Sequence, residues 1–145
     1  MSLKKLEFDY GINSNNIISD IPFSIYSGAI DCLGNLSELK CRSEIFSEFF
    51  EELSKICHNI QLLDIYFLSD IPNGLLNLIS VQQNLKNFRM FSDYGRNLTT
   101  LLTTLPNTII KLDLYGGRRC MPNIPLSFIT NFTNLQELYI SSHPN

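Results

Sequence analysis

The chain has 145 residues, of which 44% are hydrophobic and 17% charged, and its formal net charge is −3. This length fits one domain with a continuous core, and the slightly acidic balance excludes the basic field that draws proteins to nucleic acid or anionic membranes. No apolar run approaches the roughly 20 residues of a membrane-spanning helix, and the segment from Met1 to Leu6 lacks the apolar stretch of a secretory signal. We therefore expect an intracellular protein, cytoplasmic or nuclear, that contacts neither nucleic acid nor membrane.

A six-residue pattern, apolar-x-x-apolar-x-apolar, occurs six times along the chain. It starts at Leu3, Leu36, Ile60, Leu85, Ile109 and Leu135, at intervals of 33, 24, 25, 24 and 26 residues. Alternate residues of a strand point to the same side, so the second and third apolar positions of each pattern are predicted to face a core. Four of the five intervals fall within the ~20–29 residues of leucine-rich repeats. The pattern predicts six strands, five of them regularly spaced.

Each interval between the strands contains apolar residues at helical spacing. Helices are expected over about residues 22–33, 43–57, 70–79, 98–105 and 124–132, the first of them preceded by a polar loop over residues 13–19. Ser43 is a plausible N-cap for the second helix. Pro72 and Pro125 suit first turns, and Pro106 ends the helix before it.

This alternation predicts an α/β leucine-rich-repeat solenoid, a single domain over residues 1–145. Six parallel strands would line its concave face and five helices its convex face. The alternative is an ordinary βα domain whose spacing is accidental. Because the array starts and ends on a strand without a closing helix, we expect a fragment of a longer array that self-associates when isolated.

The chain also departs from the standard leucine-rich repeat. That motif continues with Asn or Cys three residues after the third apolar position, where the side chain bonds to neighbouring backbone. The corresponding residues here are Gly11, Glu44, Leu68, Asp93, Gly117 and His143. We therefore expect no asparagine ladder, and irregular turns.

Two segments resemble a known family. The run Leu76–Lys86 (LNLISVQQNLK) is similar to the recurring LLxLISVQxNLK unit of fungal F-box/leucine-rich-repeat proteins, and 124–138 (IPLSFITNFTNLQEL) resembles their PLxFIxNFxNLQEL unit. The resemblance implies a protein–protein interaction module, the substrate-recognition repeats of an F-box ubiquitin-ligase adaptor. In that family an F-box docks onto a cullin-RING ligase. This sequence shows no F-box, so only the substrate-selecting half is implied.

The residues between the core positions are predicted to form three rows on the other side of the sheet. The middle row alternates in charge from Glu7 through Lys40, Asp64, Arg89 and Asp113, and a neighbouring row carries Tyr66, Phe91 and Tyr115. Aromatic residues and arginine are enriched at interface hot spots. We predict that a protein partner binds at Tyr66, Phe91 and Tyr115, with Asp64, Arg89 and Asp113 beside them. Two structural explanations remain open: the charges keep the sheet in register, and the aromatics reflect strand propensity.

No enzymatic motif is found. The sequence lacks a GxSxG elbow, a phosphate loop and HExxH, so we expect no catalytic residues, no cofactor and no metal site. Its cysteines, Cys32, Cys41, Cys57 and Cys120, form no CxxC pair and are expected to be free thiols. A loop with paired arginines, 115–119, is an alternative site for a phosphorylated ligand. The other functions left open are a stand-alone scaffold or inhibitor, and a truncated product without a role of its own.

Overall fold

The computed structural model describes residues 2–8, 26–42, 47–68, 70–92, 98–117 and 125–142. These residues form an α/β structure with one six-stranded parallel sheet, whose strands lie in chain order from one edge to the other. The strands are β1 (Lys5–Glu7), β2 (Glu38–Arg42), β3 (Leu62–Phe67), β4 (Asn87–Ser92), β5 (Lys111–Gly116) and β6 (Glu137–Ser142). The predicted α/β class, the six parallel strands and the five helical segments are confirmed within the described residues.

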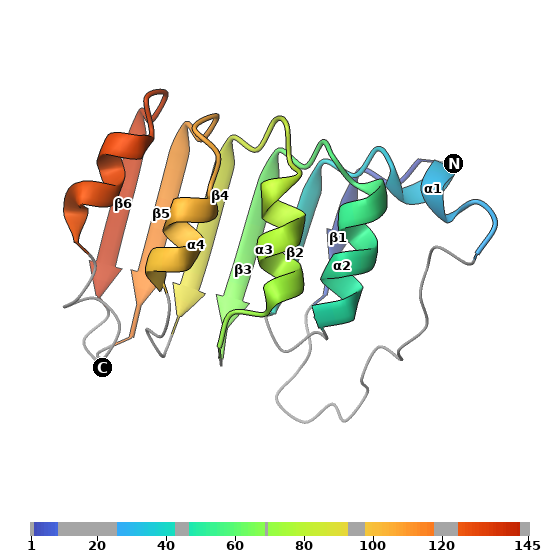
Figure 1. Ribbon diagram of the computed structural model, residues 1–145, viewed down its shortest axis with the longest axis horizontal. Helices are drawn as coiled ribbons and strands as arrows, with labels where there is room; N and C mark the ends of the chain where they lie inside the picture. The colour runs from blue at the N-terminus through green and yellow to red at the C-terminus, as the bar shows by residue number, and fades with distance from the viewer. Residues whose placement is uncertain are drawn as a thin grey trace.

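The helical segments all lie over the same face of the sheet (Figure 1). They are α1 (Ala29–Leu33), α2 (Ser47–Ile56), α3 (Asn73–Ser80), α4 (Leu98–Thr104) and a 3-10 helix, η2 (Leu126–Asn131). Each helix leads from one strand to the next parallel strand, as parallel pairing requires. None of the described helices has the length and apolarity needed to cross a bilayer.

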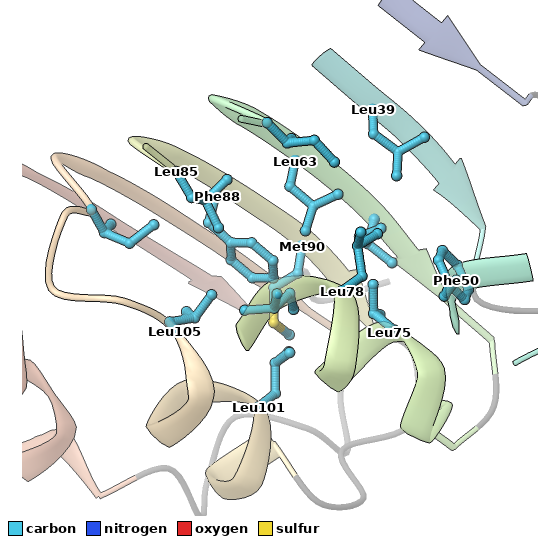
Figure 2. Close-up of a cluster of buried hydrophobic side chains, with 14 of the residues drawn as sticks. Leu39, Phe50, Leu63, Leu75, Leu78, Leu85, Phe88, Met90, Leu101 and Leu105 are labelled. Carbon is cyan, nitrogen blue, oxygen red and sulfur yellow. The ribbon is translucent and has the colours of Figure 1, made fainter. Parts of the chain in front are cut away.

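The core lies between the sheet and the helices (Figure 2). Strand residues Leu63, Phe88 and Met90 face helix residues such as Leu75 and Leu101, and all five are at most 1% exposed. Burying a leucine or phenylalanine side chain completely contributes about 1.5–3 kcal/mol. Because one helix per strand supplies such residues, the core runs as a continuous layer across β2 to β5.

The first helix is shorter than predicted. A helix from about Pro22 would include residues 26–28, but α1 begins only at Ala29. Gly28, directly before it, has a φ of 90°, a left-handed conformation that a right-handed helix cannot contain. Residues 22–25, Ser43 and Ile124, which belong to predicted helix starts, lie outside the described residues.

Gly74 allows the neighbouring helices α2 and α3 to approach closely. A Cβ atom at this position would lie 2.0 Å from the carbonyl oxygen of Ser47. The backbone N–H of Gly74 donates a hydrogen bond of 2.8 Å to the hydroxyl of Ser47. One of the unpaired N–H groups at the start of α3 is thereby satisfied by the start of α2.

The turns that lead into the strands repeat one hydrogen-bond pattern. Before each of β2 to β6, a carbonyl on the preceding turn or strand accepts two successive N–H groups at 2.8–3.0 Å; the acceptors are the carbonyls of Lys4, Ser37, Gln61, Lys86 and Ile110. The turns at this end of the strands are therefore regular, whereas the predicted irregularity concerns the turns at the other end. At the other end, Leu68 and Gly117 are described, whereas Gly11, Glu44, Asp93 and His143 lie outside the described residues.

Polar side chains also form hydrogen bonds between consecutive turns. These side chains lie just before the apolar patterns that start at Ile60, Leu85, Ile109 and Leu135. Asn84 donates to Asn59 at 2.6 Å, Thr108 to the Leu85 carbonyl at 2.7 Å, and Asn134 to the Asn107 carbonyl at 2.9 Å. The buried Gln82 bonds the N–H of Ile60 and the carbonyls of Cys57 and Leu78. This polar series precedes the strands, whereas the asparagine of the standard motif, absent here as expected from the sequence, follows them.

Candidate binding face

The side of the sheet opposite the described helices carries the three predicted rows of residues, which we call the open face. Strand pairing aligns Asp64 with Arg89 and Arg89 with Asp113, and it aligns Tyr66 with Phe91 and Phe91 with Tyr115. The first row, from Lys5 through Glu38, Leu62, Asn87 and Lys111 to Glu137, is aligned in the same way. Asp9, at the start of the aromatic row, lies outside the described residues.

The charged row is centred on Arg89, which lies between two carboxylates. Its guanidinium is 3.3 Å from the Oδ2 atom of Asp113 and 3.6 Å from the Oδ2 atom of Asp64. Asp113 is buried, only 5% exposed, whereas the Arg89 side chain is half exposed. A buried carboxylate needs such a partner, because an unpaired charge is costly in a low-dielectric environment.

Asp64 is the carboxylate whose ionisation the fold opposes. Partial burial raises the pKa of Asp64, and the nearby cations Arg89 and Lys40 only partly offset this effect. The ionised form of Asp64 is therefore less favourable in the folded chain than in water. The predicted alternation of charge is present, but at Asp64 it does not compensate for the loss of hydration.

The aromatic row does not form one continuous stack. The rings of Tyr66 and Phe91 are parallel within 4°, with their centroids 4.7 Å apart, and the guanidinium carbon of Arg42 lies 5.2 Å from the Tyr66 centroid. Tyr115 instead contacts Tyr139, at 5.1 Å and 40°. Among the described residues no ring contact joins Phe91 to Tyr115. The three predicted aromatic residues therefore do not stack continuously: Tyr66 and Phe91 pair within their row, and Tyr115 pairs with Tyr139 of the middle row.

All three predicted aromatic residues are partly buried rather than fully exposed. Side chains in neighbouring parallel strands are about 4.8 Å apart, so rings in register cover one another's faces. The partly exposed rings leave some apolar surface at fixed positions. Fixed rings lose little conformational freedom when a partner binds them.

Two shallow hollows lie on the open face, and they share two residues, Lys40 and Asp64. One has a volume of about 260 Å³ and extends over β2 to β5, including Arg89 and Lys111. The other has a volume of about 220 Å³ and extends towards β1, between Glu7 and the Tyr66 ring. Lys40 therefore stands where the two hollows meet.

Two residues of the open face were not among the predicted binding residues. Tyr139 is 51% exposed and pairs with Tyr115. The sequence did contain a signal for it, because Tyr139 occupies the one position of the middle row that carries no charge. Lys40 belongs to the same row, but its place between two hollows depends on the packing of β1 to β4, which the repeat pattern does not describe.

The other candidate residues form no site in the described part of the chain. Burial raises the pKa of the Cys57 thiol to about 11 and also raises that of Cys41, so both thiols stay protonated at neutral pH. Cys32, Cys41 and Cys57 are free, and the described residues bring together no group of three metal-ligating side chains. Cys120 and the two arginines of the predicted phosphate loop, Arg118 and Arg119, lie outside the described residues.

Comparison of the chain with protein-family models finds no matching family, and searches of curated proteins and of solved structures find no similar protein.

Proposed function

We propose that the chain is a leucine-rich-repeat solenoid whose open face binds a protein partner. The repeat spacing, the chain order of the parallel strands and the one-sided placement of the helices all support this assignment. In such an array each unit buries its apolar face against its neighbours and leaves an extended sheet surface for binding.

The observation that carries the proposal is the stacked pair of Tyr66 and Phe91 beside the ion-paired Arg89. Interface hot spots are enriched in tyrosine and arginine, and they cluster where apolar side chains are held rigidly. The core already receives the alternate residues of β3 and β4, so the two rings are not needed to fill it. Their partly exposed surfaces are available to a partner.

The finer assignment is a substrate-recognition module of an F-box-type ubiquitin-ligase adaptor. It is supported only by the resemblance of Leu76–Lys86 and 124–138 to the repeat units of that family. On this proposal the chain binds the substrate, and contact with a cullin-RING ligase requires an F-box. Co-precipitation of cullin-RING subunits by these 145 residues alone would contradict that division of roles.

The binding proposal is tested with short peptides selected on the intact chain from a displayed random library. We expect Tyr66→Ala and Phe91→Ala each to lower the affinity for the selected peptides by about tenfold or more, as truncation of hot-spot residues does. Tyr115→Ala should have a similar effect on peptides that reach β5. Far-UV circular dichroism should be unchanged in all three variants.

Tyr26→Ala is the matched control, since Tyr26 is 55% exposed and lies before α1, away from the open face. It should leave peptide affinity unchanged. A selection whose binders are all insensitive to Tyr66→Ala, Phe91→Ala and Tyr115→Ala would overturn the proposal.

A further inference from the structure

We propose that the partner of the open face presents a carboxylate to Lys40, as part of an acidic peptide segment whose apolar side chains lie on the Tyr66–Phe91 pair. This inference rests on the proposed function and specifies the chemistry of the ligand. It follows from three observations: the ion pairing of the face, the position of Lys40, and the balance of charge.

The other cations of the open face already have partners. Lys5 pairs with Glu7 at 2.8 Å, and Lys111 pairs with Glu137 at 2.7 Å. Arg89 contacts two carboxylates, and Arg42 lies over the Tyr66 ring. Within the described part of the chain, Lys40 forms no ion pair within 4.0 Å. Among the described residues, Lys40 lies near Glu7 and Asp64 but without a direct ion pair to either, so it can still bind a carboxylate of a ligand.

The position of Lys40 suits the end of a ligand side chain. It lines both hollows, and its carbonyl accepts a hydrogen bond of 2.9 Å from the N–H of Phe8, which holds its backbone in place. The carboxylates on its flanks are directed to other cations, Glu7 to Lys5 and Asp64 to Arg89. Because Lys40 lines both hollows, a carboxylate that enters either hollow comes close to this residue.

The larger hollow differs in charge from the whole chain. Over the described outward-facing positions of all six strands, five cations balance five anions. The larger hollow, however, is lined by three cations, Lys40, Arg89 and Lys111, against two anions, Asp64 and Asp113, a net charge of +1. The whole chain carries −3. A hollow whose lining is positive on an acidic protein favours an anionic group.

The same residues favour a carboxylate over a phosphate group. Asp64 lines both hollows, Asp113 lines one and Glu7 the other, so a ligand group with two negative charges would meet more repulsion than a group with one. The adjoining Tyr66–Phe91 pair offers apolar contact. An acidic segment with a neighbouring apolar residue satisfies both requirements.

The test is a double-mutant cycle on a peptide selected with the intact wild-type chain. We expect Lys40→Gln to lower the affinity for the peptide by about tenfold. Lys40→Arg should retain most of the affinity, because the positive charge is kept. Changing the critical acidic residue of the peptide to its amide should cause a similar loss. That change should cause little further loss when the chain already carries Lys40→Gln.

Lys86→Gln is the matched control, because Lys86 is exposed in the turn before β4 and lines neither hollow. It should leave binding unchanged. Peptides that depend on Tyr66 but bind wild type and Lys40→Gln equally would overturn this inference and leave the binding role intact. Peptides that depend on none of the aromatic residues would overturn both. Tighter binding of a phosphoserine peptide than of the glutamate peptide would also contradict the assignment.

Discussion

Leu63 and Asp64 are consecutive residues of β3, yet they belong to surfaces with different physical roles. Leu63 is fully buried against the helices, whereas Asp64 lies on the open face with a raised pKa. The period of two in a strand separates them. On the helix side nearly every buried residue contributes to stability, while the open face contains an ionised group that folding disfavours. The comparison indicates that the composition of the open face is not explained by stability alone.

The central strand β3 and the edge strand β6 differ in how well the helices cover them. On the helix side of β3, Leu63 and Ile65 are completely buried, but Leu138 and Ile140 on β6 are 39% and 41% exposed. Strand pairing puts Leu63 and Leu138 at the same position of the repeat. Identical residues at identical positions thus differ in burial, because a helix packs against one and only partly against the other.

The largest expected effect comes from this pair of leucines. Leu63→Ala should lower the free energy of unfolding by about 2–5 kcal/mol, because it leaves a cavity in a packed core. Leu138→Ala should cost clearly less, about 1 kcal/mol, since much of its surface already contacts water. Urea denaturation measures both. Equal losses would show that β6 is covered as well as β3.

The next largest effect distinguishes a partly buried ion pair of the open face, Arg89–Asp113, from an exposed one, Lys111–Glu137. Arg89→Met should cost about 1–3 kcal/mol, because the buried Asp113 loses the hydrogen bonds that it receives from Arg89. Lys111→Met breaks only the exposed pair with Glu137, and should cost clearly less, because water screens exposed ion pairs. The same unfolding measurement compares them. A larger loss for Lys111→Met would contradict the burial assigned to Asp113.

The smallest effect concerns pH and Asp64. Because the pKa of Asp64 is raised above its ordinary 3.8, the folded chain binds this proton more tightly than the unfolded chain. The stabilising contribution is present below the ordinary pKa and is lost as the pH rises through the folded value. As the pH rises from about 4 towards 7, the Asp64→Asn variant should therefore become more stable relative to the wild type. A shift in the opposite direction would mean that Arg89 and Lys40 outweigh the burial.

The sequence alone determined the strands and their register. The core residues repeat at a spacing of 24–26 residues across β2 to β6, and parallel strands in chain order must align equivalent positions, so the neighbours of Tyr66, Asp64 and Arg89 were predictable. The start of α1 was not, because it depends on the backbone of Gly28. The polar series in the turns was not predicted either, because Asn84 and Asn134 precede the strands, whereas the asparagine of the standard motif follows them.

Tertiary structure decided what each outward-facing residue contacts. Sequence spacing places Phe91 between Tyr66 and Tyr115, but the side-chain packing pairs Phe91 with Tyr66 and Tyr115 with Tyr139. It also determines that Arg89 bonds to Asp113 and leaves Lys40 without an ion pair in the described part of the chain. Alignment along the strands follows from the periodicity of the backbone. The choice among several neighbours at similar distances depends on side-chain rotamers and burial, which a linear pattern does not contain.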